Sequence, residues 1–209
     1  MFEFVIIDTE VNAMITMKDI IREGHPTLTK RALDVEYPMD DHTKKTLKEM
    51  REFLIHSQDP ELAEKYELRP GVGLAAPQID FPVRALAIYT EDENFEILHD
   101  YIMVNPKLIS HSEAMTYMPG GEGCLSIDRE VEGLVPRYQK VTVKTHLFDP
   151  STTEISEKTL RLRGFVSIVF QHELDHLNGV LFTERVKEDL PDLEPIAFKS
   201  LKENKEEER

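Results

Sequence analysis

The sequence predicts an α+β fold in which mostly antiparallel sheets pack around a central helix that carries an HExxH motif. Residues 165–177 place apolar side chains at helical spacing, and Asn178-Gly179 is a typical helix end. Four other segments either alternate apolar and polar residues or are rich in β-branched and aliphatic ones, as strands are. They are residues 83–90, 100–106, 139–148 and 159–164.

Three helices are expected before the first of these strands. A short helix is expected at Met17–Arg22, before Gly24 and Pro26. Residues 43–56 form an amphipathic pattern, and Pro60 is a favourable first residue for a further short helix that ends at Tyr66. The apolar face of the amphipathic segment consists of Leu47, Met50, Phe53 and Leu54.

Length and composition predict one globular domain. The 209 residues are enough for a single hydrophobic core, and 40% hydrophobic with 31% charged residues is ordinary for a globular protein. We therefore expect one domain over residues 1–209, with 1–13 as an extension and 199–209 as a charged tail, both outside the core.

The chain carries no signal for a membrane or for secretion. No apolar run approaches the roughly 20 residues that a membrane helix needs. No basic residue precedes Lys18, although a secretory signal normally begins with positive charge. We expect a cytoplasmic protein that has no membrane partner.

The charge balance argues against nucleic acid as a direct partner. The formal net charge is −15, so the surface should repel phosphate backbones. Cys124 is the only cysteine, which excludes an internal disulfide and fits a reducing compartment. Taken alone, a single cysteine is more often a small buried apolar residue than a functional group.

The stretch FQHELDHLNG, residues 170–179, carries the clearest chemical signal. His172 and His176 are one helical turn apart, so their imidazoles can converge on one metal ion. Glu173 lies beside the pair and reaches far enough to act as a general base. Asp175 then becomes a structural anchor or a partner of the ligands. Two histidines on a solvated face would be the accidental alternative, but the preceding turns of this helix are apolar.

The third ligand does not follow from this motif. One metalloprotease pattern, HExxHxxGxxH, matches through Gly179 but has Phe182 where the third histidine belongs. Glu194, a downstream candidate, lies in an expected loop between two prolines. An upstream candidate is Cys124 in the glycine-rich stretch GGEGCLS, because one thiolate and two imidazoles leave a fourth position open, as catalytic sites require.

A second glycine-rich stretch is GVGLAAPQ, residues 71–78. It fits the loose dinucleotide pattern GxGxxA, but no buried strand precedes it and Pro77 would break the helix that should follow. The alternative is a loop whose main-chain groups pair with an extended peptide. Gln78 would then offer an amide donor to a developing oxyanion.

Together these stretches resemble the signatures of the peptide deformylase family, GφGφAAxQ, EGCφS and HExDH, where φ is hydrophobic. They stand in that order at residues 71–78, 122–126 and 172–176. The resemblance runs from about residue 14 to 186, and the segment around SQDPELAEKY is similar to the longer, type 2 deformylases of many Gram-positive bacteria.

By motif position, the resemblance implies that Cys124, His172 and His176 bind the metal and that Glu173 is the general base and then the general acid. The family uses ferrous iron in the cell, often replaced by zinc or nickel on purification. A Cys-His-His site also accepts cobalt.

The resemblance further implies that Gln78 and the backbone N–H of Leu125 form the oxyanion site, while Val72 and Gly73 line the substrate. The implied reaction removes the N-formyl group from nascent formyl-methionyl peptides and releases formate. Candidates for the methionine pocket are Phe165, Ile168 and Val169, which fit a plain hydrophobic core equally well.

Nascent chains also imply a transient ribosome contact. Some deformylases dock through a basic C-terminal helix, but Lys199 to Arg209 has four basic and four acidic residues. Two rival classes are a metalloendopeptidase and a non-enzymatic binding module. The absence of a downstream third ligand in this chain argues against a metalloendopeptidase. A binding module would need neither Glu173 nor Gln78, so the presence of both argues against that class.

Overall fold

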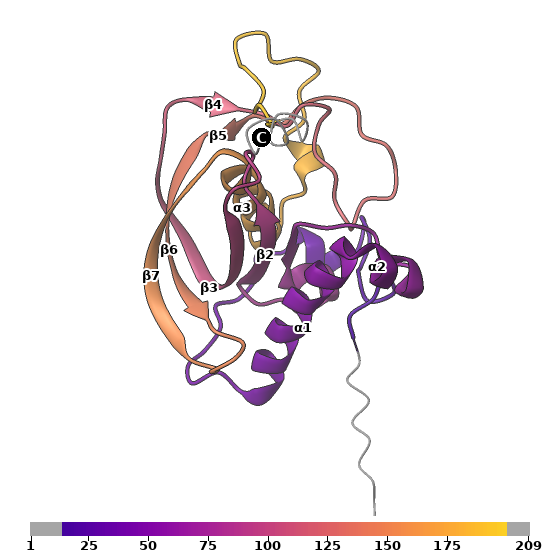
Figure 1. Ribbon diagram of the computed structural model, residues 1–209, viewed down its shortest axis with the longest axis vertical. Coiled ribbons are helices and arrows are strands. Elements are labelled where there is room, and N and C mark those ends of the chain that lie inside the picture. The colour runs from indigo at the N-terminus through magenta and orange to yellow at the C-terminus, as the bar shows by residue number, and fades with distance from the viewer. Residues whose placement is uncertain (1–13, 200–209) are drawn as a thin grey trace, which may run out of the picture.

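The computed structural model describes residues 14–199, and the expected extension and most of the charged tail lie outside this range. A five-stranded antiparallel sheet has the order β1-β2-β3-β6-β7, and a two-stranded sheet pairs β4 with β5 (Figure 1). The strands are β1 (Gly73–Ala75), β2 (Ala85–Glu91), β3 (Leu98–His111), β4 (Met115–Thr116), β5 (Arg137–Tyr138), β6 (Lys140–Phe148) and β7 (Ile155–Arg163).

Three of the four expected helices are present, with bounds close to those expected. Helix α1 spans Asp41–Gln58, and the side chain of Asp40 caps it by accepting a hydrogen bond from the Thr43 N–H. Helix α2 spans Pro60–Tyr66 and α3 spans Gly164–Leu177. Three short 3₁₀ turns lie before, between and after them, η1 (Pro26–Thr29), η2 (Ala76–Ile79) and η3 (Phe182–Glu184).

The helix expected at Met17–Arg22 is wrong, because these residues form only a turn. Asp19 accepts hydrogen bonds from the N–H and hydroxyl of Thr16, which closes the turn locally. The chain then leaves helical geometry because its donors bond elsewhere. Ile21 N–H donates to the carbonyl of Gln78 at 2.8 Å, and Glu23 N–H donates to that of Ser126 at 2.9 Å. This segment therefore ties together the two glycine-rich loops.

Strand β2 is buried on both of its faces, and this places α1 and α3 on opposite sides of the sheet. Ala85 and Ala87 belong to the core cluster that contains the apolar face of α1. Leu86 and Ile88, which point the other way, belong to the cluster that contains Phe170 and its neighbours on α3. The sheet therefore curls around α3 as the central helix, and α1 covers its outer face (Figure 1).

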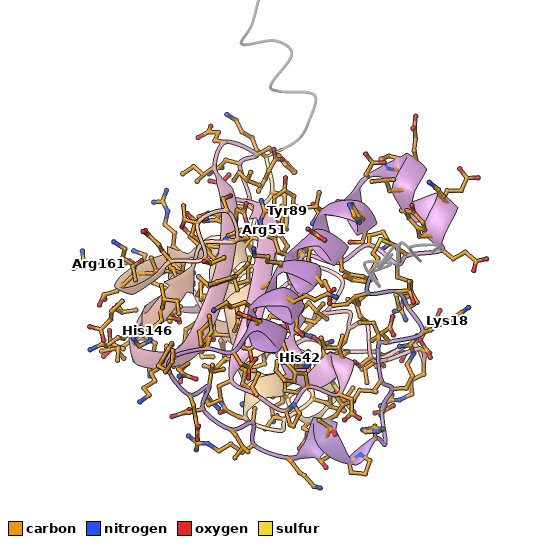
Figure 2. The ribbon with its side chains drawn as sticks, turned by 90° about the horizontal axis from the view of Figure 1, so that it is seen from below. Lys18, His42, Arg51, Tyr89, His146 and Arg161 are labelled. Carbon is orange, nitrogen blue, oxygen red and sulfur yellow. The ribbon has the colours of Figure 1, made fainter. Side chains whose placement is uncertain are left out.

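Helix α1 is fixed to the sheet by polar contacts as well as by its apolar face. Arg51 donates two hydrogen bonds to the carboxylate of Asp100 on β3, at 2.7 and 2.5 Å. Its guanidinium also lies 5.9 Å from the ring centroid of Tyr89 on β2, and Figure 2 shows these two labelled residues close together. After α1, the chain passes through α2 before it reaches β1 and η2. Within residues 14–199, no helix has the length and apolar character needed to cross a membrane.

Candidate metal centre and active site

Three side chains converge at the centre of the molecule. Helix α3 presents His172 and His176 one turn apart, with ring centroids separated by 5.1 Å. The sulfur of Cys124 lies 3.3 Å from Nε2 of His176. One ligand atom from each of the three residues lies within 4.8 Å of the others. The structure thus brings together the three residues that the sequence motifs suggested as ligands.

The two downstream positions that metalloprotease patterns use for a third ligand do not join this group. Phe182, which stands where one of these patterns has its third histidine, stacks on the ring of His172, with centroids 5.7 Å apart. Glu194 is outside the cluster, and its main-chain carbonyl accepts a hydrogen bond from the hydroxyl of Thr116. Among the described residues, the one cluster suited to hold a metal is that of Cys124, His172 and His176.

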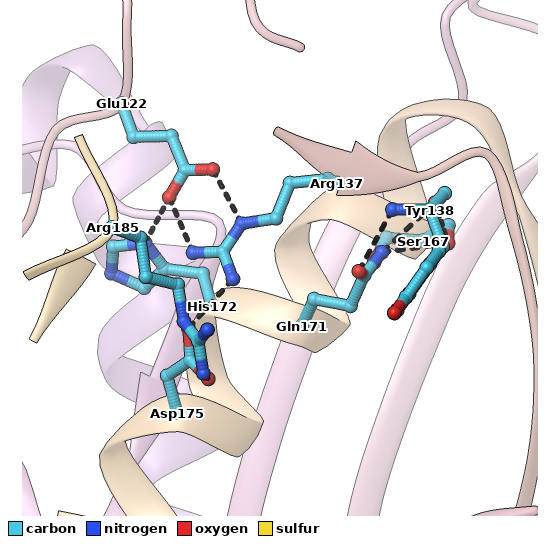
Figure 3. A network of polar contacts seen from close by, with 8 residues as sticks. All are labelled: Glu122, Arg137, Tyr138, Ser167, Gln171, His172, Asp175 and Arg185. Carbon is cyan, nitrogen blue, oxygen red and sulfur yellow. Dashed lines mark hydrogen bonds and ion pairs between the residues drawn. The ribbon is translucent and has the colours of Figure 1, made fainter. Parts of the chain in front are cut away.

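A buried polar network orients His172 (Figure 3). Its Nδ1 lies 2.8 Å from a carboxylate oxygen of Glu122. When Nδ1–H donates to that carboxylate, the lone pair of Nε2 is free to bind a metal. Arg137 holds Glu122 in turn through two hydrogen bonds of 2.7 and 2.9 Å. Burial alone would raise the pKa of Glu122, but the hydrogen bonds from Arg137 and His172 outweigh it and lower that pKa to about 2.

Asp175 completes this network from the next turn of α3. Arg137 donates to Asp175 at 2.6 Å, and Arg185 donates two further hydrogen bonds to the same carboxylate at 2.6 and 2.7 Å. The carboxylate thus anchors the helix to the β4–β5 side of the molecule, which agrees with the anchoring role expected for it. Sequence reasoning assigned no role to Glu122 and did not find Arg137.

Glu173 points into the same space, and one of its carboxylate oxygens has no hydrogen-bond partner among the described residues. That oxygen is Oε2, and the side chain is buried, with 4% of the residue exposed. Burial raises the pKa of this carboxyl to about 7. Such a carboxyl can accept and return a proton near neutral pH, which is what a general base and acid must do.

Gln78 in η2 faces Cys124. Its side-chain oxygen accepts a hydrogen bond from Ala75 N–H at 2.9 Å, which fixes the orientation of the amide. The amide nitrogen then lies 3.5 Å from the sulfur of Cys124 and 3.3 Å from the hydroxyl of Ser126. Gln78 is 1% exposed, so this donor is held in a site from which bulk water is largely excluded.

The edge of the sheet passes alongside these groups. Val72 and Leu74 direct their main-chain groups toward β2, as the hydrogen bond from Tyr89 N–H to the Val72 carbonyl shows. Gly73 lies between them, so its N–H and C=O face the open edge. An extended peptide can pair with these groups, because β1 is the first strand of the sheet.

Two residues at the end of α1 hold this edge in place. The hydroxyl of Ser57 accepts a hydrogen bond from Gly71 N–H at 3.2 Å. The amide of Gln58 donates to the carbonyls of Gly71 and Tyr89, at 2.9 and 2.7 Å. Sequence reasoning missed both residues, because nothing in an amphipathic helix pattern marks its last polar residues as loop anchors.

A cavity of about 380 Å³ opens beside the cluster. Its wall combines the proposed catalytic groups with apolar side chains of α3, as a small-molecule or side-chain site does. The cavity is lined by all of the ligand, catalytic and substrate residues that the sequence motifs suggested except His176, and by the three candidates for a methionine pocket. These lining residues are Val72, Gly73, Gln78, Cys124, Leu125, Phe165, Ile168, Val169, His172 and Glu173. The three candidates for a methionine pocket thus lie on the cavity and not only in the core.

The donor set suits a divalent transition metal. A thiolate and two neutral imidazoles favour iron, zinc, nickel or cobalt over magnesium or calcium, which prefer oxygen. Glu173, whose Oε2 has no hydrogen-bond partner among the described residues, lines the same cavity, as a base that acts on a water molecule in this site would.

The model of the polypeptide deformylase family matches residues 17–191. The chain belongs to this family. A peptide deformylase of Halalkalibacterium halodurans is 53% identical over 174 residues, which cover 83% of this chain and 92% of that protein. Peptide deformylase 2 of Bacillus subtilis is 50% identical over 182 residues, 87% of this chain and 96% of that protein. These relatives confirm the resemblance to the type 2 enzymes of Gram-positive bacteria.

Solved deformylases share the fold as well. The enzyme of Thermotoga maritima superposes with a TM-score of 0.58 at 32% identity, covering 80% of this chain and 96% of that one. A class I type b enzyme of Acinetobacter baumannii, bound to Met-Ala-Ser, gives a TM-score of 0.59 at 28% identity, with 80% and 96% covered. The α+β fold expected from the sequence is confirmed.

The chain is therefore a metal-dependent hydrolase of protein biosynthesis. It removes the N-formyl group from formyl-methionine at the N-terminus of nascent polypeptides and releases formate. The rival expectations, an endopeptidase and a binding module, do not agree with this family membership.

Proposed function

We propose that Cys124, His172 and His176 hold one ferrous ion and that Glu173 carries out the proton transfers of deformylation beside it. The observation that supports this most is the convergence of three ligand atoms within 4.8 Å, next to a buried carboxyl that has a partnerless oxygen. A bound divalent metal supplies a Lewis acid for the formyl carbonyl and makes a water molecule more acidic.

Glu173 accepts a proton from the water that attacks the formyl carbon. The same carboxyl then gives that proton to the amine nitrogen as the C–N bond breaks. Formate and a free N-terminal amine are the products, and Glu173 returns to its starting state. The raised pKa of Glu173, about 7, supports this double role because the carboxyl changes protonation near neutral pH.

Gln78 and the N–H of Leu125 stabilise the negative charge on the formyl oxygen. The amide of Gln78 is held by Ala75, so it does not need to reorient during the reaction. The Leu125 N–H belongs to the residue that directly follows the ligand Cys124. Both donors belong to residues on the cavity wall.

The substrate binds as an added strand along the open edge of β1. Gly73 pairs with the peptide backbone and Val72 covers it from the side, while the methionine side chain enters the cavity toward Phe165, Ile168 and Val169. A peptide that begins with methionine is supported as the ligand by the Acinetobacter baumannii deformylase that is bound to Met-Ala-Ser.

Ferrous iron is the proposed metal, and zinc, nickel or cobalt can replace it in the same donor set. Iron beside a thiolate predicts sensitivity to oxygen, with Cys124 as the residue that oxidises. Contact with the ribosome is proposed to be transient and without direct RNA binding, because the net charge of −15 repels RNA. Co-sedimentation with ribosomes that carry a formylated nascent chain tests this contact.

The test of the proposed reaction is formate release from formyl-Met-Ala-Ser by anaerobic iron-loaded protein, with zinc-loaded protein as the comparison. Rapid release, without cleavage of the unformylated peptide, is expected. Cleavage of the unformylated peptide would instead identify an endopeptidase. No formate from protein that holds one metal per chain would reject the proposed roles.

A further inference from the structure

Arg69 joins the two loops that form the active site. It lies two residues before Gly71, in the segment that leads into β1, and its guanidinium reaches across to the loop of Cys124. It donates to the carbonyls of Cys124 at 3.1 Å and Ile127 at 3.2 Å, and to the carboxylate of Asp128 at 2.7 Å. A longer contact of 3.4 Å reaches the carbonyl of Leu125.

One of these contacts acts on the proposed oxyanion donor. The carbonyl of Cys124 and the N–H of Leu125 belong to the same planar trans peptide group, so they point in opposite directions. A group that holds the oxygen on one side therefore fixes the direction of the N–H on the other. Arg69 holds this oxygen together with the Ile127 N–H, which donates to it at 3.2 Å.

The N–H end of this peptide group has no competing partner. Within residues 14–199, no protein group accepts a hydrogen bond from Leu125 N–H. Cys124 and Leu125 are 8% and 6% exposed, and both line the cavity. The donor is therefore oriented, shielded from most solvent and available to a ligand.

A positive charge at the oxygen also strengthens the donor. Hydrogen bonding to a carbonyl draws electron density toward its oxygen and leaves the N–H of the same amide more polar. The effect is larger when the partner is charged, as a guanidinium always is. The side chain of Arg69 is 44% exposed, so solvent weakens this effect but does not remove it.

We propose that Arg69 is a positioning residue for deformylation, which orients and polarises the Cys124–Leu125 peptide group so that Leu125 N–H stabilises the oxyanion. This inference rests on the proposed role of Leu125. It differs from the two simpler roles that the contacts of Arg69 allow. One is direct binding of substrate at the cavity wall, and the other is a surface clamp through Asp128, which Arg22 also binds at 3.0 Å.

The test compares three variants of the full, zinc-loaded chain. Arg69→Met removes the donor and the charge, Arg69→Lys keeps the charge, and Asp128→Asn weakens only the clamp. For each variant, metal content is measured, together with kcat and KM for formyl-Met-Ala-Ser and the ¹H and ¹⁵N chemical shifts of the Leu125 amide.

Arg69→Met is expected to keep one metal per chain, to lower kcat about tenfold and to change KM by less than about twofold. The Leu125 amide resonance should move, because its peptide group loses a charged partner. Arg69→Lys should recover part of both effects. Asp128→Asn should leave kcat and the Leu125 resonance close to those of the parent chain.

Three results would overturn the inference. A raised KM with an unchanged kcat would make Arg69 a substrate contact. Equal losses in Arg69→Met and Asp128→Asn would make it a clamp. An unmoved Leu125 resonance would show that the guanidinium does not act on this peptide group. Failure of the proposed function looks different, because the parent chain itself would then release no formate while the Leu125 resonance still responds to Arg69.

Discussion

The backbone of Gly73 lies directly against the carboxyl group of Glu173. A Cβ on Gly73 would be 2.8 Å from both Cγ and Cδ of Glu173 and closer still to Oε1, whereas real carbon contacts essentially never fall below 3.0 Å. The strand edge proposed to hold the peptide and the carboxyl proposed to move the proton therefore share one small space. The glycine at this position is what leaves room for the base.

Gly73→Ala should consequently displace Glu173 without touching the metal ligands. We expect one metal per chain and a kcat at least about a hundredfold lower, because a misplaced general base loses most of its contribution. Metal analysis and formate release measure both. Gly123→Ala is the matched control, since a Cβ there meets nothing within 4 Å. Equal activity of the two variants would contradict the close packing.

Cys124→Ala should lose metal as well as activity. Removing the thiolate leaves two imidazoles, and two ligands rarely hold a catalytic metal. Competition with a chelator should show zinc affinity reduced by several orders of magnitude. Tight binding of one zinc per chain by this variant would remove Cys124 from the ligand set.

Glu122→Gln should weaken metal binding about 10–100-fold, the usual effect of removing the carboxylate that orients a ligating histidine. The variant keeps a side chain of the same shape but loses the charge that faces Arg137 and the Nδ1–H of His172. Chelator competition measures the change. Arg185→Met is the control, because Arg185 contacts the outer part of the network through Asp175 only. The role given to Glu122 would be refuted if the control weakened metal binding as much.

Gln58→Met should raise KM for formyl-Met-Ala-Ser about tenfold and leave kcat within about threefold. The variant keeps the length of the side chain but loses two hydrogen bonds to main-chain carbonyls, each contributing about 1 kcal/mol. The edge strand would then lose its anchor beside the peptide. Formyl-Met amide, which has no downstream residues, should be much less affected. Gln139→Met removes a similar amide-to-carbonyl contact away from the cavity and should leave both constants unchanged.

Much of this fold follows from local sequence patterns. The period of residues 165–177 and the four alternating or aliphatic segments correspond to α3 and to β2, β3, β6 and β7. The helix predicted at Met17–Arg22 does not form, because the N–H groups of Ile21 and Glu23 pair with distant loops. Such long-range pairing leaves no local trace. Strand β1 was missed for a similar reason, since three residues in a glycine-rich loop carry no periodicity.

The candidate site likewise contains residues that local sequence predicts and residues that only the fold brings together. His172, Glu173 and His176 are close in sequence, so helical spacing alone predicts that they meet. Cys124 joins them only through the fold, and its place in a recognisable motif made it a candidate. Arg137 and Gln58 lie in no such motif. Each acts through several hydrogen bonds to residues outside its own element, and those contacts appear only when the strands and helices are packed.

The central claim is that Glu173 moves the proton while other residues hold the metal, and Glu173→Gln tests it most directly. This variant keeps the shape of the side chain and removes its ability to accept a proton. Metal content and formate release from formyl-Met-Ala-Ser are measured on the same iron-loaded, anaerobic sample. We predict one metal per chain and a kcat lowered by at least about a thousandfold. A variant that holds its metal and still releases formate at more than a tenth of the parent rate would contradict the account.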